Sequence, residues 1–552
     1  MIDPTSIAGL TIAIFDQLLK LGERTAQLIA DARGFDNDTD DLYDKLKDEN
    51  NRTAQLRHLL FEASPIYGGL ALFEKFDEDV QDQIKIFLGR LVSTLHEGHE
   101  LLQRRYGTTG TIVRSPSPSG SMKSLSLHSQ KSSSTLDLFK AFPKSSIMVL
   151  RWSLRDKKRT EEVLANFSDL NSRIHENIKL WSLASSIGVD MQHLQRLRND
   201  QASISLGFNL DASLQLAAGD ARAVTGTLEL QGEKWVETLT HSKTVEERFA
   251  LVTTKESRLL QENRSYEANH HRCKDAGIDT RTKDRVDGLA KLLQQPKDQV
   301  FCIPRCMGWK YLPDQARIAF AFEIPSGINS DPLSLHRLLA MPNVKPTLGD
   351  KFRLAFKLAN CMAQLQMVKW VHESFRSENV LFFPLDCESP GSFSKSGSSS
   401  APEIDYGEPW VLGFEYSRPE ADFSLGITDI CIERDIYRHP VRQGQPGMMF
   451  NKIHDIYALG VVLLELGLWE QAITLEKNRF QHARDPYAIQ SQLVKHASRR
   501  LGARMGERYK NVVVTCLTGE FSVTDDTKED LKLQQAFRSQ IVDVLERSAN
   551  NI

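Results

Sequence analysis

The sequence predicts a multidomain, mostly α protein in which an all-α helical bundle precedes a two-lobed α+β unit. Two observations support this order. Through the first 200 residues apolar side chains recur at three- and four-residue steps, as in Leu42, Leu46, Leu56, Leu59 and Leu60, which is typical of amphipathic helices. Beyond residue 200, short apolar runs typical of strands alternate with helical segments, and from residue 347 onward the helical pattern dominates.

Three domains follow from this change in pattern. We expect a helical bundle over residues 1–195, a β-rich lobe over 200–335 and a larger helical lobe over 336–552. Two Ser-rich segments, 114–134 and 388–403, contain too few large apolar side chains to support a core, so we expect them to be mobile loops. Ser115 and Ser117, each followed by proline, are candidate phosphorylation sites within the first loop.

The β-rich lobe is predicted from four apolar runs, ISLGFNL, GTLELQG, VFCIPRC and RIAFAFEIP. A helical segment, RVDGLAKLLQQP, interrupts them. In the following lobe Thr347 begins a helix, because it is an N-cap hydroxyl with Asp350 three residues later.

Composition excludes some classes of function. The net charge of −3 gives no electrostatic reason to expect nucleic acid as a partner. The seven cysteines are scattered without a CxxC pair, and their odd number indicates a reducing, cytoplasmic location. Cys302 and Cys306 follow His270, His271 and Cys273, but their spacing fits no standard zinc pattern, so no metal site is expected.

The helix from Thr347 leads into VHESFRSENVLFF, which resembles the catalytic loop of protein kinases, H-R-D-x-x-x-x-N. The resemblance puts His372 on the histidine, Glu373 on the arginine, Ser374 on the catalytic aspartate and Asn379 on the metal-binding asparagine. Arg376 takes the place of the lysine that steadies the transferred phosphate. A serine hydroxyl has no useful basicity at neutral pH, so the proton acceptor of a kinase is missing.

Downstream, PWVLGFEYSRP occupies the place of the kinase D-F-G segment. Gly413 then stands where the magnesium-binding aspartate belongs, Phe414 on the phenylalanine and Glu415 on the glycine. A glycine offers no side-chain oxygen to a metal ion. We therefore expect neither ATP nor magnesium to bind, and we expect no enzymatic activity.

The phosphate-binding parts of the first lobe are also missing. No G-x-G-x-x-G array is present, and GEKWVETL, which resembles the strand that carries the kinase lysine, has Thr238 or Leu239 near that position. Lys234 and Lys243 stay open as substitutes.

Features of the scaffold are retained. DIYALGVVLLELGLW resembles kinase helix F, whose aspartate, here Asp455, hydrogen-bonds backbone amides of the catalytic loop. His372 and Phe414 match apolar stacking positions that link the lobes. Tyr437–Pro440 resembles the segment that closes the activation loop, with Asp435 just before it. Four matches in kinase order favour a degenerate kinase-like domain, a pseudokinase.

The first half has a second resemblance. Its uncharged start and the tract RWSLRDKKRTEEVLANFSDLNSRI make residues 5–195 similar to the HeLo domain of fungal prion-inhibition and propagation proteins. The resemblance implies a role in heterokaryon incompatibility or programmed cell death, with an amino-terminal helix that enters membranes on release. It also gives a basic cluster a role in binding anionic lipid: Arg151, Arg155, Lys157, Lys158 and Arg159.

Residues alone leave two interpretations of the amino terminus open. The stretch Pro4–Phe15 carries no charge, and it is either a buried core helix or a helix that enters membranes. Spanning a bilayer takes about 20 apolar residues, more than this stretch supplies.

We therefore hypothesise a pseudokinase that regulates a helical effector. Protein partners are expected, together with homo-oligomerisation and membrane association on activation. An active, atypical serine/threonine kinase that binds ATP and a passive interaction scaffold stay open as alternatives.

Overall fold

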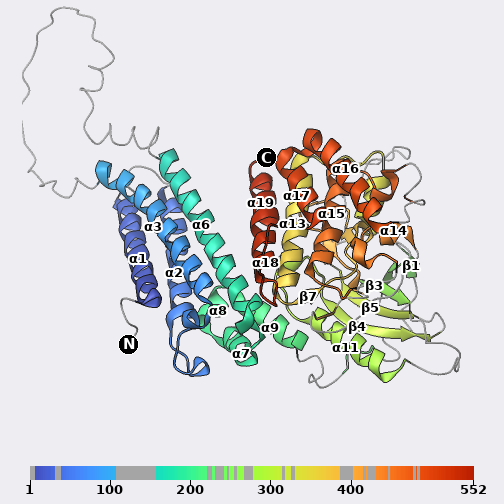
Figure 1. Ribbon diagram of the computed structural model, residues 1–552, viewed down its shortest axis with the longest axis horizontal. Coiled ribbons are helices and arrows are strands. Elements are labelled where there is room, and N and C mark those ends of the chain that lie inside the picture. The colour runs from blue at the N-terminus through green and yellow to red at the C-terminus, as the bar shows by residue number, and fades with distance from the viewer. Residues whose placement is uncertain are drawn as a thin grey trace, which may run out of the picture. The chain divides into compact units, whose positions relative to one another are not determined.

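The structure is a computed structural model (Figure 1). It describes residues 6–31, 39–106, 157–219, 227–230, 242–244, 248–253, 258–265, 278–313, 317–324, 330–385, 402–414, 418–419, 431–444, 448–476, 480 and 485–552. The chain forms two compact units, Met1–Ser182 with Asn199–Phe208, and Leu183–Arg198 with Asn209–Ile552. The boundary expected at 195–200 falls where the two units exchange segments.

The first unit is an all-helical bundle, as predicted. Its long helices are α1 (Ile7–Asp31), α2 (Thr39–Phe61), α3 (Glu78–Tyr106) and α6 (Lys157–Ala184). Helix α1 packs against α2 and α3, and the short α8 (Gln201–Ser205) packs against α2. The apolar stripes seen in the sequence form the core, with Leu56, Ile84 and Ile174 fully buried.

A buried polar contact joins α2 to α6 inside this bundle. The Asn171 side chain donates from Nδ2 to Glu49 Oε2 over 2.7 Å and accepts from Thr53 Oγ1 over 3.3 Å. Buried amides are costly unless they are paired, so this contact favours one register of the two helices.

Helix α1 contains Ile7–Phe15 of the uncharged amino-terminal stretch, whose first two residues lie outside the described residues. Phe15, Leu18 and Ile29 on this helix are fully buried, whereas Leu10 keeps 43% of its surface exposed. In this conformation the stretch is a core helix. Within the described ranges, no helix is long and apolar enough to cross a membrane.

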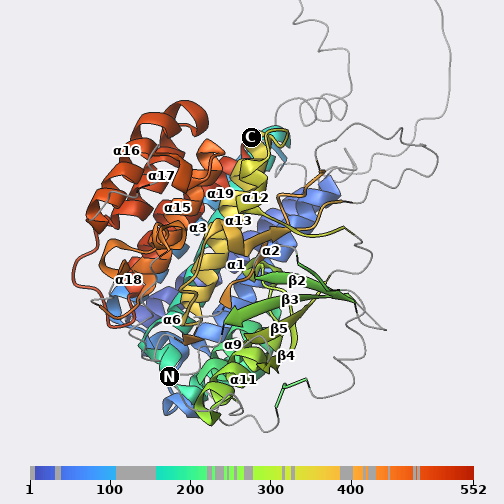
Figure 2. The ribbon, with the colours of Figure 1, turned by 90° about the vertical axis from the view of Figure 1, so that its right-hand side faces the viewer.

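The second unit begins with α7 (Met191–Asn199) and α9 (Phe208–Gly219) and then forms an antiparallel sheet in the order β1-β2-β3-β5-β4 (Figure 2). The strands are β1 (Ser242–Thr244), β2 (Phe249–Thr253), β3 (Arg258–Ser265), β4 (Cys306–Leu312) and β5 (Arg317–Glu323). Helix α11 (Thr280–Gln294) lies between β3 and β4 in the chain. Its Asp287 accepts hydrogen bonds from Trp309 Nε1 on β4 and from the Leu228 backbone.

The larger part of this unit is helical. Its helices are α12 (Leu335–Ala340), α13 (Leu348–Met367), α14 (Ile432–Asp435), α15 (Lys452–Leu468), α16 (Pro486–Met505), α17 (Glu507–Thr518), α18 (Leu531–Phe537) and α19 (Asp543–Asn550). Helix α15 is buried along almost its whole length and packs against α13, α16 and α17. Thr347 and Asp350 form the predicted capping box of α13.

Two sequence-based strand assignments were wrong. ISLGFNL lies in α8 and α9 because Asp200 caps the first of these helices by accepting from the Ser203 amide. VFCIPRC forms a short 3₁₀ helix, Gln299–Phe301, before β4 begins. The third strand of the sheet is β3, whereas GEKWVETL and its Lys234 lie outside the described residues.

A small antiparallel sheet with one helix, followed by a large helical lobe, is the plan of a protein kinase. The second unit therefore has the predicted two-lobed kinase-like α+β fold, and the chain as a whole is mostly α. Both Ser-rich segments lie outside the described residues, apart from the last two positions of 388–403.

Candidate functional site

The segment that resembles the catalytic loop connects two short strands. It leaves β7 (Trp370–Val371), passes through the 3₁₀ turn Ser377–Asn379 and enters β8 (Val380–Phe382). Strand β8 pairs with β6 (Leu333–Ser334) and β9 (Trp410–Val411), and β7 pairs with β10 (Arg418–Pro419). Pairing of β8 with β9 brings the loop beside Leu412–Phe414, so two segments predicted from sequence lie together.

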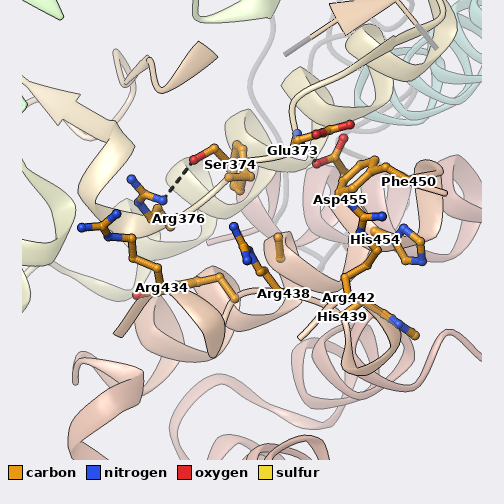
Figure 3. Close-up of a pocket in the computed structure, with 13 residues that line it drawn as sticks. Glu373, Ser374, Arg376, Arg434, Arg438, His439, Arg442, Phe450, His454 and Asp455 are labelled. Carbon is orange, nitrogen blue, oxygen red and sulfur yellow. Dashed lines mark hydrogen bonds between the residues drawn. The ribbon is translucent and has the colours of Figure 1, made fainter. Parts of the chain in front are cut away.

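The carboxylate of Asp455, on α15, binds the backbone of this loop (Figure 3). Its carboxylate accepts the His372 N–H over 2.8 Å and the Glu373 N–H over 3.0 Å. Asp455 is 1% exposed, so these are buried, charge-assisted hydrogen bonds. They hold the backbone of Glu373 in the left-handed region, at φ 61°, which residues other than glycine rarely adopt.

His372 is fixed in one tautomer by its surroundings. Nε2 lies 3.0 Å from the Leu412 carbonyl and must donate to it, so Nδ1 accepts the Ser374 N–H over 3.3 Å. Burial lowers the pKa of His372 to about 3, which keeps the ring neutral. The ring also stacks on Phe414 with centroids 4.7 Å apart.

Ser374 is enclosed by its neighbours at the position of the kinase base. Its hydroxyl accepts from Arg376 Nη1 over 3.0 Å, and its carbonyl accepts from Asn379 Nδ2 over 2.6 Å. Arg376 also pairs with Glu378 at 2.9 Å. Side chains that would reach substrate and metal in a kinase therefore contact one another here.

Gly413 has no room for a side chain. Its φ of +91° favours glycine, and a Cβ built on it would lie 2.0 Å from Asn379 Nδ2. An aspartate could enter this position only if Asn379 moved. Glu415 and the two residues after it lie outside the described residues.

Sequence analysis missed Glu262. This residue is 2% exposed on β3, and its Oε2 accepts the Gly413 N–H over 3.2 Å. Its Oε1 pairs with Arg248 Nη2 over 3.2 Å. Glu262 faces the D-F-G-like segment from the third strand, which is the strand that carries a lysine in kinases. A signal was present in the sequence, since an acid follows two leucines inside the strand sequence RLLQEN.

The segment at Tyr437–Pro440 joins the loop through a second buried network. Tyr437 Oη lies 2.7 Å from Glu465 Oε1 on α15 and 2.9 Å from Ser377 Oγ. Burial raises the pKa of Glu465 to about 7. These contacts tie the end of the activation-segment equivalent to α15.

The remaining candidates take no part in the contacts of the loop. Cys306 is buried in β4, where burial raises the pKa of its thiol to about 12, and Cys302 lies at the turn before it. Among the residues that the structure describes, no cluster of acids, histidines and cysteines is arranged to hold a metal ion. Lys158 and Arg159 are exposed on α6, and Arg151 and Arg155 lie outside the described residues.

Residues 323–552 match a family described as a domain of unknown function, DUF7580. A crystal structure of a kinase domain is similar at 12% identity and a TM-score of 0.34, over 57% of this chain and 97% of that chain. The search of curated proteins found no match.

Replacing Asp455 should destabilise the second unit strongly. The Asp455→Ala variant leaves two buried N–H groups without their acceptor, which should lower the free energy of unfolding by about 2–5 kcal/mol. Urea unfolding followed by tryptophan fluorescence measures this. Glu520→Ala, an exposed acid in the same unit, should change it by less than about 0.5 kcal/mol. Equal losses in the two variants would contradict the role given to Asp455.

His372 should make stability depend on pH. Its pKa is lowered in the folded state, so its contribution is complete above about pH 6.5 and declines as the pH falls toward 3, at up to about 1.4 kcal/mol per pH unit. In His372→Gln this decline should be shallower by about that slope, as measured by urea unfolding between pH 4 and 7. A His372→Gln slope equal to that of the wild type would refute this assignment.

Proposed function

We propose that this protein is a pseudokinase regulator, in which a kinase-like unit without phosphoryl-transfer activity is coupled to a helical effector unit. One observation carries the proposal. Asn379 occupies the space that a side chain at position 413 would need, and it contacts Ser374, the serine at the position of the catalytic base. In this proposal Gly413 and Ser374 both fit the folded structure, since the contacts around them fill the site.

The absence of a proton acceptor supports this proposal first. Ser374 accepts a hydrogen bond from Arg376, a permanent cation that has no lone pair with which to accept a proton, so this pair supplies no base. The neutral ring of His372 is engaged through both nitrogens, so it offers no replacement. No other described side chain at this loop takes the role of general base in our proposal.

The residues at the positions that hold magnesium in kinases also support the proposal. Magnesium in kinases is held by an aspartate and an asparagine. Gly413 offers no side-chain ligand. Asn379 donates from its amide nitrogen to the Ser374 carbonyl, and its amide oxygen, which has no hydrogen-bond partner among the described residues, is then the one kinase-type metal ligand left of the two. Glu262 places a buried carboxylate on β3, the strand whose kinase equivalent carries the phosphate-binding lysine, and a carboxylate repels phosphate. These residues do not fit Mg-ATP.

Addition of Mg-ATP to the full-length protein should therefore leave its melting temperature unchanged. A ligand at 100 times its dissociation constant adds about 2.7 kcal/mol of stability, which a thermal-shift titration detects. Transfer of phosphate to a general protein substrate should equal the blank, and Ser374→Ala should not alter it. A magnesium-dependent rise in melting temperature, or transfer abolished by Ser374→Ala, would favour the atypical kinase instead.

The role of the first unit is the second half of the proposal. Its resemblance to the HeLo domain supports an effector in cell death or heterokaryon incompatibility, released by a signal that the kinase-like unit receives from a protein partner. Exposed Lys158 and Arg159 supply positive charge for anionic lipid, each worth about 1 kcal/mol near a charged surface. Arg159 has only a loose, exposed contact with Glu97, at 3.7 Å. We place the resting protein in the cytoplasm, with homo-oligomerisation and membrane association on activation.

Vesicle leakage tests the effector. The full-length protein should leave anionic vesicles intact without a signal, whereas a fragment of residues 1–208, which contains the first unit without the kinase-like unit, should release dye at micromolar concentration. In this fragment Leu10→Glu should abolish release because it puts a charge on the helix that inserts. Leu10 is 43% exposed, so the folded state tolerates this change. Leu70→Glu, at a leucine that is 44% exposed outside α1, is the matched control and should retain release. Intact vesicles with the unsubstituted fragment, or equal effects of the two variants, would refute the membrane step.

A further inference from the structure

Two cysteine thiols meet in the second unit, where the turn before β4 contacts α13, and the proposed function gives them no role. Cys302 ends the 3₁₀ helix Gln299–Phe301, and Cys361 lies in the middle of α13. They are far apart in the sequence and come together because this turn packs against the helix. Both are free cysteines.

The backbone of the turn limits the distance between the two residues. Cys361 Sγ donates to the Phe301 carbonyl over 2.9 Å. That oxygen belongs to the peptide bond that enters Cys302, and in a trans peptide it lies about 3 Å from the next Cα atom. The Cys361 sulfur is therefore within about 6 Å of the Cys302 Cα.

The two thiols also contact each other. A hydrogen bond from the Cys302 thiol, followed by burial, raises the pKa of Cys361 well above its usual range. A disulfide requires the sulfurs to approach from such a contact to about 2 Å, and it joins Cα atoms that usually lie about 4.4–6.8 Å apart. Small side-chain rotations are enough to close the bond.

The surroundings of the two thiols differ. Cys361 is fully buried and stays protonated at neutral pH, so it does not react with a dissolved oxidant by itself. Cys302 is partly exposed. Oxidation of cysteine depends on access to the sulfur, so Cys302 is the residue that an oxidant reaches first.

Other described cysteines do not compete for this contact. The Cys306 thiol, four residues after Cys302, donates to the Gly308 carbonyl over 3.5 Å. Cys431 lies beside Glu433, and burial raises the pKa of Cys516 on α17. Of the cysteines that the structure describes, Cys302 and Cys361 are the two whose thiols lie together.

We propose that Cys302 and Cys361 form a reversible disulfide when hydrogen peroxide oxidises the protein. The Cys302 thiolate attacks one peroxide oxygen, the O–O bond breaks, and the departing hydroxide leaves as water with the proton that this thiol released. The Cys361 sulfur then attacks the sulfur of the sulfenic acid. The S–O bond breaks, and the second hydroxide leaves as water with the Cys361 proton.

One peroxide is thus reduced to two waters, and two thiols are oxidised to one disulfide. Two molecules of a small thiol such as glutathione reverse the reaction by exchange. In a reducing compartment such a disulfide is transient and serves as a redox sensor.

The disulfide would join parts of both lobes of the second unit. The turn that contains Cys302 leads into β4 of the five-stranded sheet, whereas Cys361 belongs to the helical lobe. The Cys302 carbonyl also accepts the Val411 N–H of β9 over 2.7 Å. A covalent bond at this turn therefore restricts movement of the sheet relative to α13, whether or not the chain transfers phosphate.

Mass spectrometry of the full-length protein tests the proposal. The folded protein is treated with a small molar excess of hydrogen peroxide, its free thiols are blocked with iodoacetamide, and it is digested without reductant. We expect a pair of peptides joined through Cys302 and Cys361, about 2 Da lighter than the two reduced peptides together. Dithiothreitol should separate them.

Three serine variants identify the role of each thiol. Cys302→Ser should leave Cys361 reduced after peroxide, whereas Cys361→Ser should stop Cys302 at the sulfenic acid, which dimedone captures. Cys431→Ser, at another partly exposed thiol, is the matched control and should keep the disulfide. Melting temperatures without peroxide check that each variant folds. Wild-type protein in which Cys361 stays reduced, or in which Cys302 joins a different cysteine, would overturn the proposal.

Discussion

The buried carboxylate of Asp455 is the group on which the rest of the site depends. A charge at the centre of a helical lobe is costly unless hydrogen bonds replace the water it has lost. Asp455 meets that need with the amides of His372 and Glu373, and in doing so it holds the loop in a strained conformation. The apolar burial of α15 gives the carboxylate a fixed position from which to act.

The contacts of Asp455 also help to position residues far away in the sequence. Once its backbone is held, His372 donates to the Leu412 carbonyl and stacks on Phe414, which places the segment that contains Gly413. Gly413 then donates to Glu262 on the sheet. None of these contacts requires a reacting group, which is why such a scaffold is compatible with a serine and a glycine at the two chemical positions.

Electrostatics within the second unit are arranged unlike those of a working kinase. A carboxylate, Glu262, faces the segment where a kinase gathers phosphate and metal, and Arg248 is its partner. Four arginines line a pocket beside α14 instead, Arg376, Arg434, Arg438 and Arg442 (Figure 3).

Sequence alone predicted the features that depend on local pattern. The helical bundle, the capping box at Thr347, helix α11 and the helix that carries Asp455 follow from apolar periodicity and capping, which act between residues a few positions apart. Strand assignment was weaker, because short apolar runs such as ISLGFNL suit either a strand or a buried helix until their partners are known.

Tertiary structure alone decided which distant groups meet. The pairing of β3 with β5 and the approach of Gly413 gave Glu262 its place, and no spacing in the chain encodes a contact between residues 262 and 413. The closeness of Asn379 to Gly413 and the gathering of four arginines likewise depend on how the chain folds back on itself. Local sequence determines which elements form, whereas the environment of each buried polar group is a property of the packed whole.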